Sequence, residues 1–200
     1  MKYSFKLWES AALGALCLTL LAACWAQGRQ TELEGNLIRL HVIAADDSEQ
    51  EQALKLRVRD AVLACLAPKL EGVADAADAA ETVRDSLEEI RLAAESASEG
   101  RSVAVALGQE RYPLRQYEGF ALPAGMYRSL RVTLGEGQGH NWWCVVFPPL
   151  CLRSAADPAV QSVMNVDDLH LIQQDEGYEI RFRVLELWGE LQAWLAERQS

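Results

Sequence analysis

Residues 135–151, GEGQGHNWWCVVFPPLC, form the part of the chain richest in side chains that could do chemistry. The segment holds one histidine, two adjacent tryptophans, two cysteines and a Pro-Pro pair. Three kinds of site fit these residues: a disulfide bond, a catalytic thiol and a metal centre. The glycines at the start of the segment lead into a predicted strand rather than a helix, so we interpret them as a strand-joining turn and not as a phosphate loop.

A disulfide between Cys144 and Cys151 is the leading interpretation. The intervening Pro148-Pro149 pair can turn the chain back and bring the two Cα atoms to the roughly 5.5 Å that a disulfide needs. In an entropy model, closing so small a loop stabilises the folded state by about 2–3 kcal/mol. Because disulfides persist mainly in oxidising compartments, this interpretation depends on export of the chain.

The two alternatives remain open on weaker patterns. A catalytic thiol would pair Cys144 with His140 or His41, but the sequence offers no third residue to orient the histidine. A metal centre would use His41, His140, Cys144 and Cys151, although neither CxxC nor HxxxH spacing occurs. We therefore predict no catalytic residue, no metal and no cofactor, and keep an exported Cys-dependent hydrolase as the alternative function.

The N-terminal segment predicts export. Lys2 and Lys6 precede an almost unbroken apolar run over residues 11–26. As a helix, this run would span about 24 Å, less than the roughly 30 Å of a bilayer core. A basic start followed by a short apolar run is typical of a secretory signal peptide. We therefore assign residues 1–26 to a signal peptide or signal-anchor, and residues 27–200 to a single domain.

The way in which this segment is processed stays open. Residues 21–24, LAAC, resemble the lipobox of bacterial lipoproteins, in which Cys24 would carry the lipid. The small residues that follow also permit ordinary cleavage near Ala26, and an uncleaved anchor is the third alternative. The expected location is outside the cytoplasm, either free or membrane-anchored.

Composition excludes several classes of function. The chain has 200 residues, is 50% hydrophobic and carries a net charge of −10. A nucleic-acid partner is not expected, because tracking a phosphate backbone requires clustered Lys and Arg. The same acidity argues against adsorption to anionic lipid, so we expect membrane contact only through the N-terminal segment.

The remaining elements predict an α+β domain. Residues 36–44 alternate as a strand whose core side is apolar and whose other side, with Arg39 and His41, we expect to be exposed. A helix follows over residues 49–66, with Ser48 and Glu51 as a capping box and Pro68 beyond its end. A second helix over residues 75–98 completes an α-hairpin, and a heptad stripe of mainly small residues marks its packing face.

The C-terminal half predicts antiparallel strands and a final helix. We expect strands over residues 102–107, 112–122 and 127–134, and a central, doubly covered strand over residues 142–147 that ends at Pro148. Residues 153–177 read as an irregular connection, and residues 178–198 as the C-terminal helix. Strands and helices are segregated along the chain, as in α+β folds.

Three segments together resemble the stage II sporulation protein R family of endospore-forming bacteria. They are residues 38–62, IRLHVIAADDSEQEQALKLRVRDAV, residues 122–151, LPAGMYRSLRVTLGEGQGHNWWCVVFPPLC, and residues 179–188, EIRFRVLELW. The NWWCVVFPPLC string is the most specific of these. The resemblance implies a signalling protein rather than an enzyme, made in the forespore and exported into the space between the two sporangial membranes.

The partner implied by this resemblance is a membrane-embedded aspartic protease of the mother cell. Its activation would lead to processing of the precursor of the early mother-cell sigma factor. A binding protein should carry aromatic and charged residues on its contact surface. The candidate partner-binding residues are Arg39, His41, Asp46, Asp47, His140, Asn141, Trp142 and Trp143. For Trp142 and Trp143, burial in the core is the competing interpretation.

Overall fold

The computed structural model describes residues 6–117 and 120–150, and it divides the chain into an N-terminal unit up to Leu33 and a second unit from Glu34 onward. The N-terminal unit is one helix, α1 (Leu7–Gly35), whose last two residues belong to the second unit. An 18-residue window of α1 has a mean hydropathy of 1.7, so the helix is apolar and long enough to cross a membrane. It extends well beyond residues 11–26, and it fits either a signal peptide or a membrane anchor.

The second unit is built on a four-stranded mixed sheet with the strand order β2-β5-β1-β6. Its strands are β1 (Ile38–Ile43), β2 (Val103–Tyr112), β5 (Gly125–Leu134) and β6 (Asn141–Phe147). Strand β1 runs antiparallel to β6 but parallel to β5, so the expectation of purely antiparallel strands was wrong. A parallel pair needs a long crossover, and the helices together with β2 supply it.

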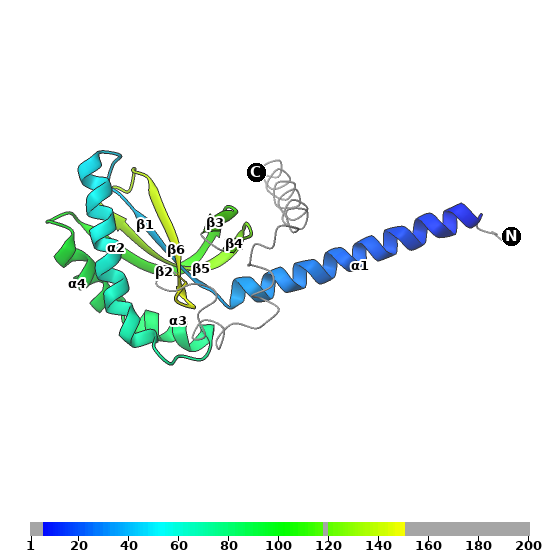
Figure 1. Ribbon diagram of the computed structural model, residues 1–200, viewed down its shortest axis with the longest axis horizontal. Helices are drawn as coiled ribbons and strands as arrows, with labels where there is room; N and C mark the ends of the chain where they lie inside the picture. Colours follow the sequence, from blue (N-terminus) through cyan, green and yellow to red (C-terminus); the bar gives the residue numbers. More distant parts are fainter. Residues whose placement is uncertain (1–5, 118–119, 151–200) are drawn as a thin grey trace. The chain divides into compact units, whose positions relative to one another are not determined.

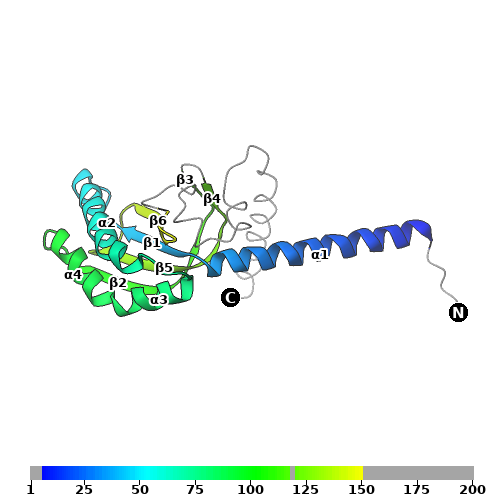
Figure 2. The same cartoon turned by 60° about the horizontal axis from the view of Figure 1, so that its bottom comes forward.

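Three helices cover one face of this sheet: α2 (Glu49–Leu70), α3 (Ala76–Asp85) and α4 (Leu87–Ala97). Figures 1 and 2 show them grouped on the side of the sheet away from the short hairpin β3 (Arg115–Tyr117) and β4 (Phe120–Leu122). The core between helices and sheet joins Ile38, Leu40 and Val42 of β1 to apolar residues of all three helices. The α+β class and the single folded domain of the second unit are therefore confirmed; the predicted C-terminal helix and residues 153–177 lie outside the described residues.

The predicted helices differ from the observed ones at two points. Helix α2 continues to Leu70 with Pro68 inside it, because a proline in the last turn removes only one hydrogen bond there. The helix predicted over residues 75–98 is broken at Ser86, whose φ of −94° and ψ of 3° interrupt the hydrogen-bond ladder. The predicted packing face survives this break, because Ala76, Val83 and Ile90 are all buried.

The start of α2 shows which half of the predicted capping box forms. The Ser48 hydroxyl accepts a hydrogen bond from the Glu51 backbone N–H at 3.3 Å, as expected for an N-cap. The reciprocal bond is absent, because the Glu51 carboxylate accepts from the Arg101 guanidinium at 2.8 Å. The Ser48 N–H donates instead to Asp46 at 2.8 Å. This arrangement fixes the turn that leads from β1 to α2.

Strand β6 has a different place in the sheet from the one predicted. Within the described residues it lies at one end of the strand order, beside β1, rather than at the centre. Its last four residues, Cys144 to Phe147, are all buried, which is the pattern that suggested a central strand. Burial of both faces depends on what packs above and below a strand. It does not show whether the strand has a hydrogen-bonded neighbour on one side or on both. The strand ends at Phe147, immediately before Pro148, as predicted.

Candidate partner-binding surface

Six of the eight predicted contact residues come together where β1 ends and β6 begins. The pairing of Ile43 with Asn141 brings the loop after β1 against the loop before β6. A pocket of about 550 Å³ opens there, which we call the β6 pocket; it is lined by Asp47, Arg115–Tyr117 and residues 138–143. Asp46 lies in the same turn, next to Asp47. The residues predicted from the sequence therefore form one wall of the pocket. The other wall is β3, which the sequence analysis did not single out.

Gly139 allows the two loops to approach this closely. Its N–H donates to the Ala44 carbonyl at 3.0 Å, and a Cβ built on Gly139 would lie only 2.2 Å from the Asp46 carbonyl oxygen. No side chain fits in that space. The predicted interpretation of the glycine run as a strand-joining turn is confirmed, since it connects β5 to β6.

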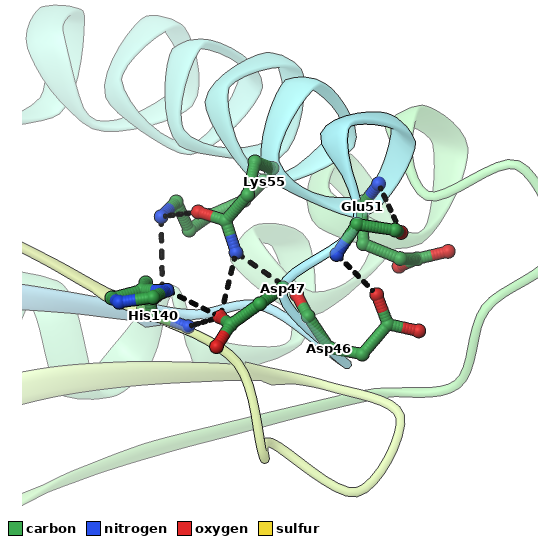
Figure 3. A network of polar contacts seen from close by, with 7 residues as sticks. Asp46, Asp47, Glu51, Lys55 and His140 are labelled. Atoms are coloured by element: carbon green, nitrogen blue, oxygen red, sulfur yellow. Dashed lines mark hydrogen bonds and ion pairs between the residues drawn. The ribbon is translucent and has the colours of Figure 1, made fainter.

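Asp47 and His140 join the two loops (Figure 3). One carboxylate oxygen of Asp47 accepts from the His140 backbone N–H at 2.6 Å and lies 2.5 Å from His140 Nδ1. Both side chains are more than half exposed, at 54% and 76%. The pair therefore orders the rim of the pocket while remaining accessible from outside.

A buried lysine supports this rim from below. Lys55 of α2 is 5% exposed, and its ammonium donates to the His140 carbonyl oxygen at 2.9 Å and to Gln52 Oε1 at 2.5 Å. Burial lowers the pKa of Lys55, while the nearby Asp47 charge opposes that shift. Hydrogen bonds from Ser48 lower the pKa of Asp46. Helix α2, the loop after β1 and the loop before β6 are thus locked together, as Figure 3 shows.

Arg39 and His41 do not lie on the surface, so the prediction that they are exposed was wrong. Arg39 is 0% exposed and His41 is 6% exposed. Their alternation with apolar residues correctly placed them on the face of β1 away from the helices. That face is covered by aromatic side chains from β2, β5 and β6 and by the β3–β4 hairpin, which alternation within one strand cannot reveal.

The buried guanidinium of Arg39 is held mainly by aromatic rings. Its carbon lies 3.8 Å from the centroid of the Tyr112 ring and 4.9 Å from that of Tyr127. Its Nη2 donates to the Tyr117 hydroxyl at 2.6 Å. Cation–π contacts of this kind are strongest when the cation is desolvated. Arg39 therefore ties the β3–β4 hairpin to the sheet.

His41 occupies a hydrogen-bonded position beside this cluster. Its Nδ1 lies 2.8 Å from Glu110 Oε1, and its Nε2 lies 3.0 Å from Asn141 Oδ1. Glu110 also accepts from the Ser129 hydroxyl at 2.8 Å. His41 thereby supports Asn141 in the pocket lining from beneath, and it cannot itself contact a partner on the surface.

The cysteines do not assemble with both histidines. Cys144 lies opposite Leu40 in the β1–β6 register, and His41 lies opposite Trp143, so Cys144 and His41 point to opposite faces of the sheet. Neither the catalytic pair of Cys144 with His41 nor the metal set that included both is formed. Cys151 lies outside the described residues, so its disulfide with Cys144 stays a prediction.

Two arginines stack on the tryptophans of β6. The guanidinium carbon of Arg115 lies 3.6 Å from the Trp143 ring centroid, and that of Arg59 lies 4.9 Å from the Trp142 ring centroid. Both indoles are half-buried, and they point to opposite faces of the sheet, because Trp142 pairs with Val42 and Trp143 pairs with His41. Trp142 packs against the core under the helices, whereas Trp143 lies on the hairpin side beside His41 and Tyr112. Both residues are among those that line the pocket. Arg115 could not be singled out from local pattern, because its strand has only three residues.

Comparison with known proteins decides the family. A family model described as stage II sporulation protein R matches residues 34–157, which is more than half of the chain. The chain belongs to the stage II sporulation protein R family. The matched range contains every residue of the β6 pocket, and membership gives the chain a role in sporulation. The family name denotes a sporulation protein and not a class of enzyme.

One curated relative extends this result. The chain is 37% identical over 118 residues to a protein of Bacillus subtilis (strain 168) named stage II sporulation protein R. The aligned part covers 57% of this chain and 53% of the relative, so the chain spans about half the length of that protein. No solved structure matches the chain.

Proposed function

We propose that this chain is an exported intercellular signalling protein that activates a membrane-embedded aspartic protease of the mother cell during endospore formation. The activated protease then removes the pro-sequence of the early mother-cell sigma factor precursor. The observation that carries the proposal is the family match over residues 34–157, which spans the whole described surface around the β6 pocket. The chain acts in the space between the two sporangial membranes, free or held there by α1.

The geometry supports a binding role for this surface. Its rim is ordered by the Asp47–His140 pair, and Trp142, Trp143 and Arg115 are among the residues that line it. Tryptophan and arginine dominate the binding energy of many protein interfaces. A ligand of this kind activates a protease only by binding its active state more tightly than its inactive state. The buried Arg39 and His41 act in the proposal as supports of that surface and not as contacts.

Processing in a non-sporulating host tests the proposal directly. The full chain, the protease and the sigma factor precursor are produced together, and loss of the pro-sequence is followed by gel mobility. We expect processing only when all three are present. A Trp142→Ala, Trp143→Ala double variant should lower processing at least tenfold, whereas Leu92→Ala, at an exposed position on α4, should leave it unchanged. Processing that does not depend on the chain would refute the proposed function.

The predicted disulfide is tested by mass measurement of the exported protein. Reduction adds two hydrogen atoms, about 2 Da, if Cys144 and Cys151 are bridged. We expect this difference, and we expect Cys144→Ser to lower the amount of folded protein without abolishing signalling by the molecules that fold. If Cys144→Ser instead folds normally and loses all function, the alternative of a Cys-dependent hydrolase is favoured.

A further inference from the structure

The wall of the β6 pocket carries positive charge that no carboxylate neutralises within the part of the chain that the structure describes. Arg115 lines the pocket, and Arg39 lies directly behind Tyr117, which also lines it. Neither guanidinium forms an ion pair with a described carboxylate.

Both guanidinium groups also have buried nitrogen atoms for which the described residues offer no hydrogen-bond partner. These are Nε of Arg115 and both Nε and Nη1 of Arg39, the latter in a side chain that is 0% exposed. A buried cationic group with unpaired donors costs free energy, and a negative charge brought close to the guanidinium would lower that cost. The two arginines are thus held by flat aromatic faces, with donor capacity still unused.

The stacking geometry selects the kind of anion. The guanidinium carbon of Arg115 lies 3.6 Å from the Trp143 ring centroid and its Nε is buried, so a ligand would meet the outer edge that carries the two Nη atoms. A guanidinium edge binds the two oxygens of a carboxylate with two parallel hydrogen bonds. The Trp143 indole, on which Arg115 lies, belongs to a residue of the same pocket lining and provides an apolar surface beside that charge.

The carboxylate within the lining does not cancel this preference. Asp47 accepts from His140 and from Gln52, and its charge lies near the Lys55 ammonium. The Nδ1 atom of His140 faces Asp47. The two glutamines of the lining, Gln116 and Gln138, carry no charge. Glu110, behind the pocket wall, is likewise engaged by His41 and Ser129. Arg115 is therefore left without a carboxylate partner among the described residues.

We propose that the β6 pocket is the recognition site for a carboxylate-bearing peptide segment of the partner, with Arg115 as the group that holds the carboxylate and the Trp143 indole as the surface for a neighbouring apolar side chain. This proposal deepens the proposed function and rests on it for the identity of the partner. The carboxylate comes from an Asp or Glu side chain or from a chain terminus. Anionic membrane lipid is not the expected source, because the net charge of the chain would oppose it.

Affinity for the protease separates this proposal from a purely structural role of Arg115. Binding of the full chain to the detergent-solubilised protease is measured for the wild type, Arg115→Gln, Arg115→Lys and Arg111→Gln. Arg111 is exposed on β2, on the face of the sheet opposite to that of Tyr112. Its variant therefore controls for the loss of one positive charge away from the pocket. We expect Arg115→Gln to weaken binding roughly ten- to a hundredfold, Arg115→Lys to lie between, and Arg111→Gln to stay within about twofold.

Exchanging the charges of Arg115 and its partner carboxylate distinguishes a lost contact from a misfolded variant. Each Asp and Glu in the extracytoplasmic segments of the protease is replaced by Lys, and the variants are paired with Arg115→Glu. Restored binding of one such pair would identify the contacting carboxylate. If Arg115→Gln binds as tightly as Arg111→Gln while processing continues, the pocket proposal is wrong and the proposed function stands.

A peptide experiment tests the pocket without the protease. The probes are acetyl-Gly-Phe-Glu-Gly-amide, its Gln counterpart, acetyl-Gly-Phe with a free carboxyl terminus, and vesicles of anionic phospholipid. We expect only the two carboxylate peptides to shift the indole N–H resonance of Trp143, and only with Arg115 intact. The peptide that binds more tightly shows whether the natural carboxylate is a side chain or a chain terminus. Peptide binding without protease binding would refute the proposed partner alone. Equal response to the Glu and Gln peptides, response to vesicles only, or no response overturns the pocket proposal.

Discussion

The two faces of the central strand β1 are buried by different kinds of side chain. Toward the helices, Leu40 and its neighbours meet an apolar core drawn from α2, α3 and α4. Toward the hairpin, Arg39 and His41 meet tyrosines, a tryptophan and Glu110. The first face is stabilised by the burial of apolar surface, which does not require exact shape complementarity. The second depends on hydrogen bonds and ring stacking, which require defined geometry and place Asn141 and Tyr117 in the pocket wall.

The largest effect should come from the helix face. Leu40→Ala removes a fully buried side chain at the centre of the core, so we expect a loss of about 2–5 kcal/mol in the free energy of unfolding. Denaturant titration of the full chain measures this loss. Leu56→Ala, on the exposed side of α2 at 39% exposure, should cost far less. Equal losses for the two variants would mean that the helices do not pack on β1 as described.

The two faces also differ in how well a sequence reveals them. The helix face was predicted from periodicity alone, because every second residue of β1 and every third or fourth residue of the helices is apolar. The break at Ser86 left that prediction intact, since the same side of both helices still packs on the sheet. Local patterns suffice where burial is apolar.

The hairpin face could not be predicted in this way. Arg39 and His41 have the polarity of a solvated face, and only tertiary structure brings Tyr112, Tyr127 and Tyr117 over them. Likewise, the sequence indicated His140 to Trp143 through their unusual types but not Arg115, which comes from a three-residue strand. A residue whose role depends on a partner far along the chain carries no local signal of that role.

The junction between the loops should give the next largest effect. Gly139→Ala places a Cβ 2.2 Å from the Asp46 carbonyl oxygen, so the backbone must shift and the Asp47–His140 pair must loosen. We expect a loss of about 1–3 kcal/mol. Gly108→Ala on β2 is the matched control, because nothing lies within 4 Å of its added Cβ. Thermal unfolding of both variants gives the comparison, and a neutral Gly139→Ala would contradict the close approach.

Arg39 offers a test of what holds the hairpin face. Arg39→Lys keeps the charge but loses the guanidinium contact with the Tyr112 ring and the bond to the Tyr117 hydroxyl, and it leaves a compact, strongly hydrated cation in a buried site. We expect it to cost about 1–3 kcal/mol. Arg39→Met removes the charge with its unpaired nitrogens and should cost less. If lysine is tolerated better than methionine in denaturant titration, charge rather than stacking stabilises this face.

The smallest expected effect concerns the tyrosines of the hairpin face and depends on pH. Burial raises the pKa of both Tyr112 and Tyr127 above the ordinary value near 10. The unfolded chain therefore releases these protons first as pH rises, so it binds fewer protons than the folded chain, and stability should fall above about pH 10. Below that pH the contribution is fully present. At neutral pH, Tyr127→Phe loses only its bond to the Pro123 carbonyl, about 1 kcal/mol, and it should flatten the alkaline decline. Leu40→Ala should lower the whole curve without changing that slope. An alkaline slope identical in the wild type and Tyr127→Phe would show that the phenol of Tyr127 already reaches water in the folded chain.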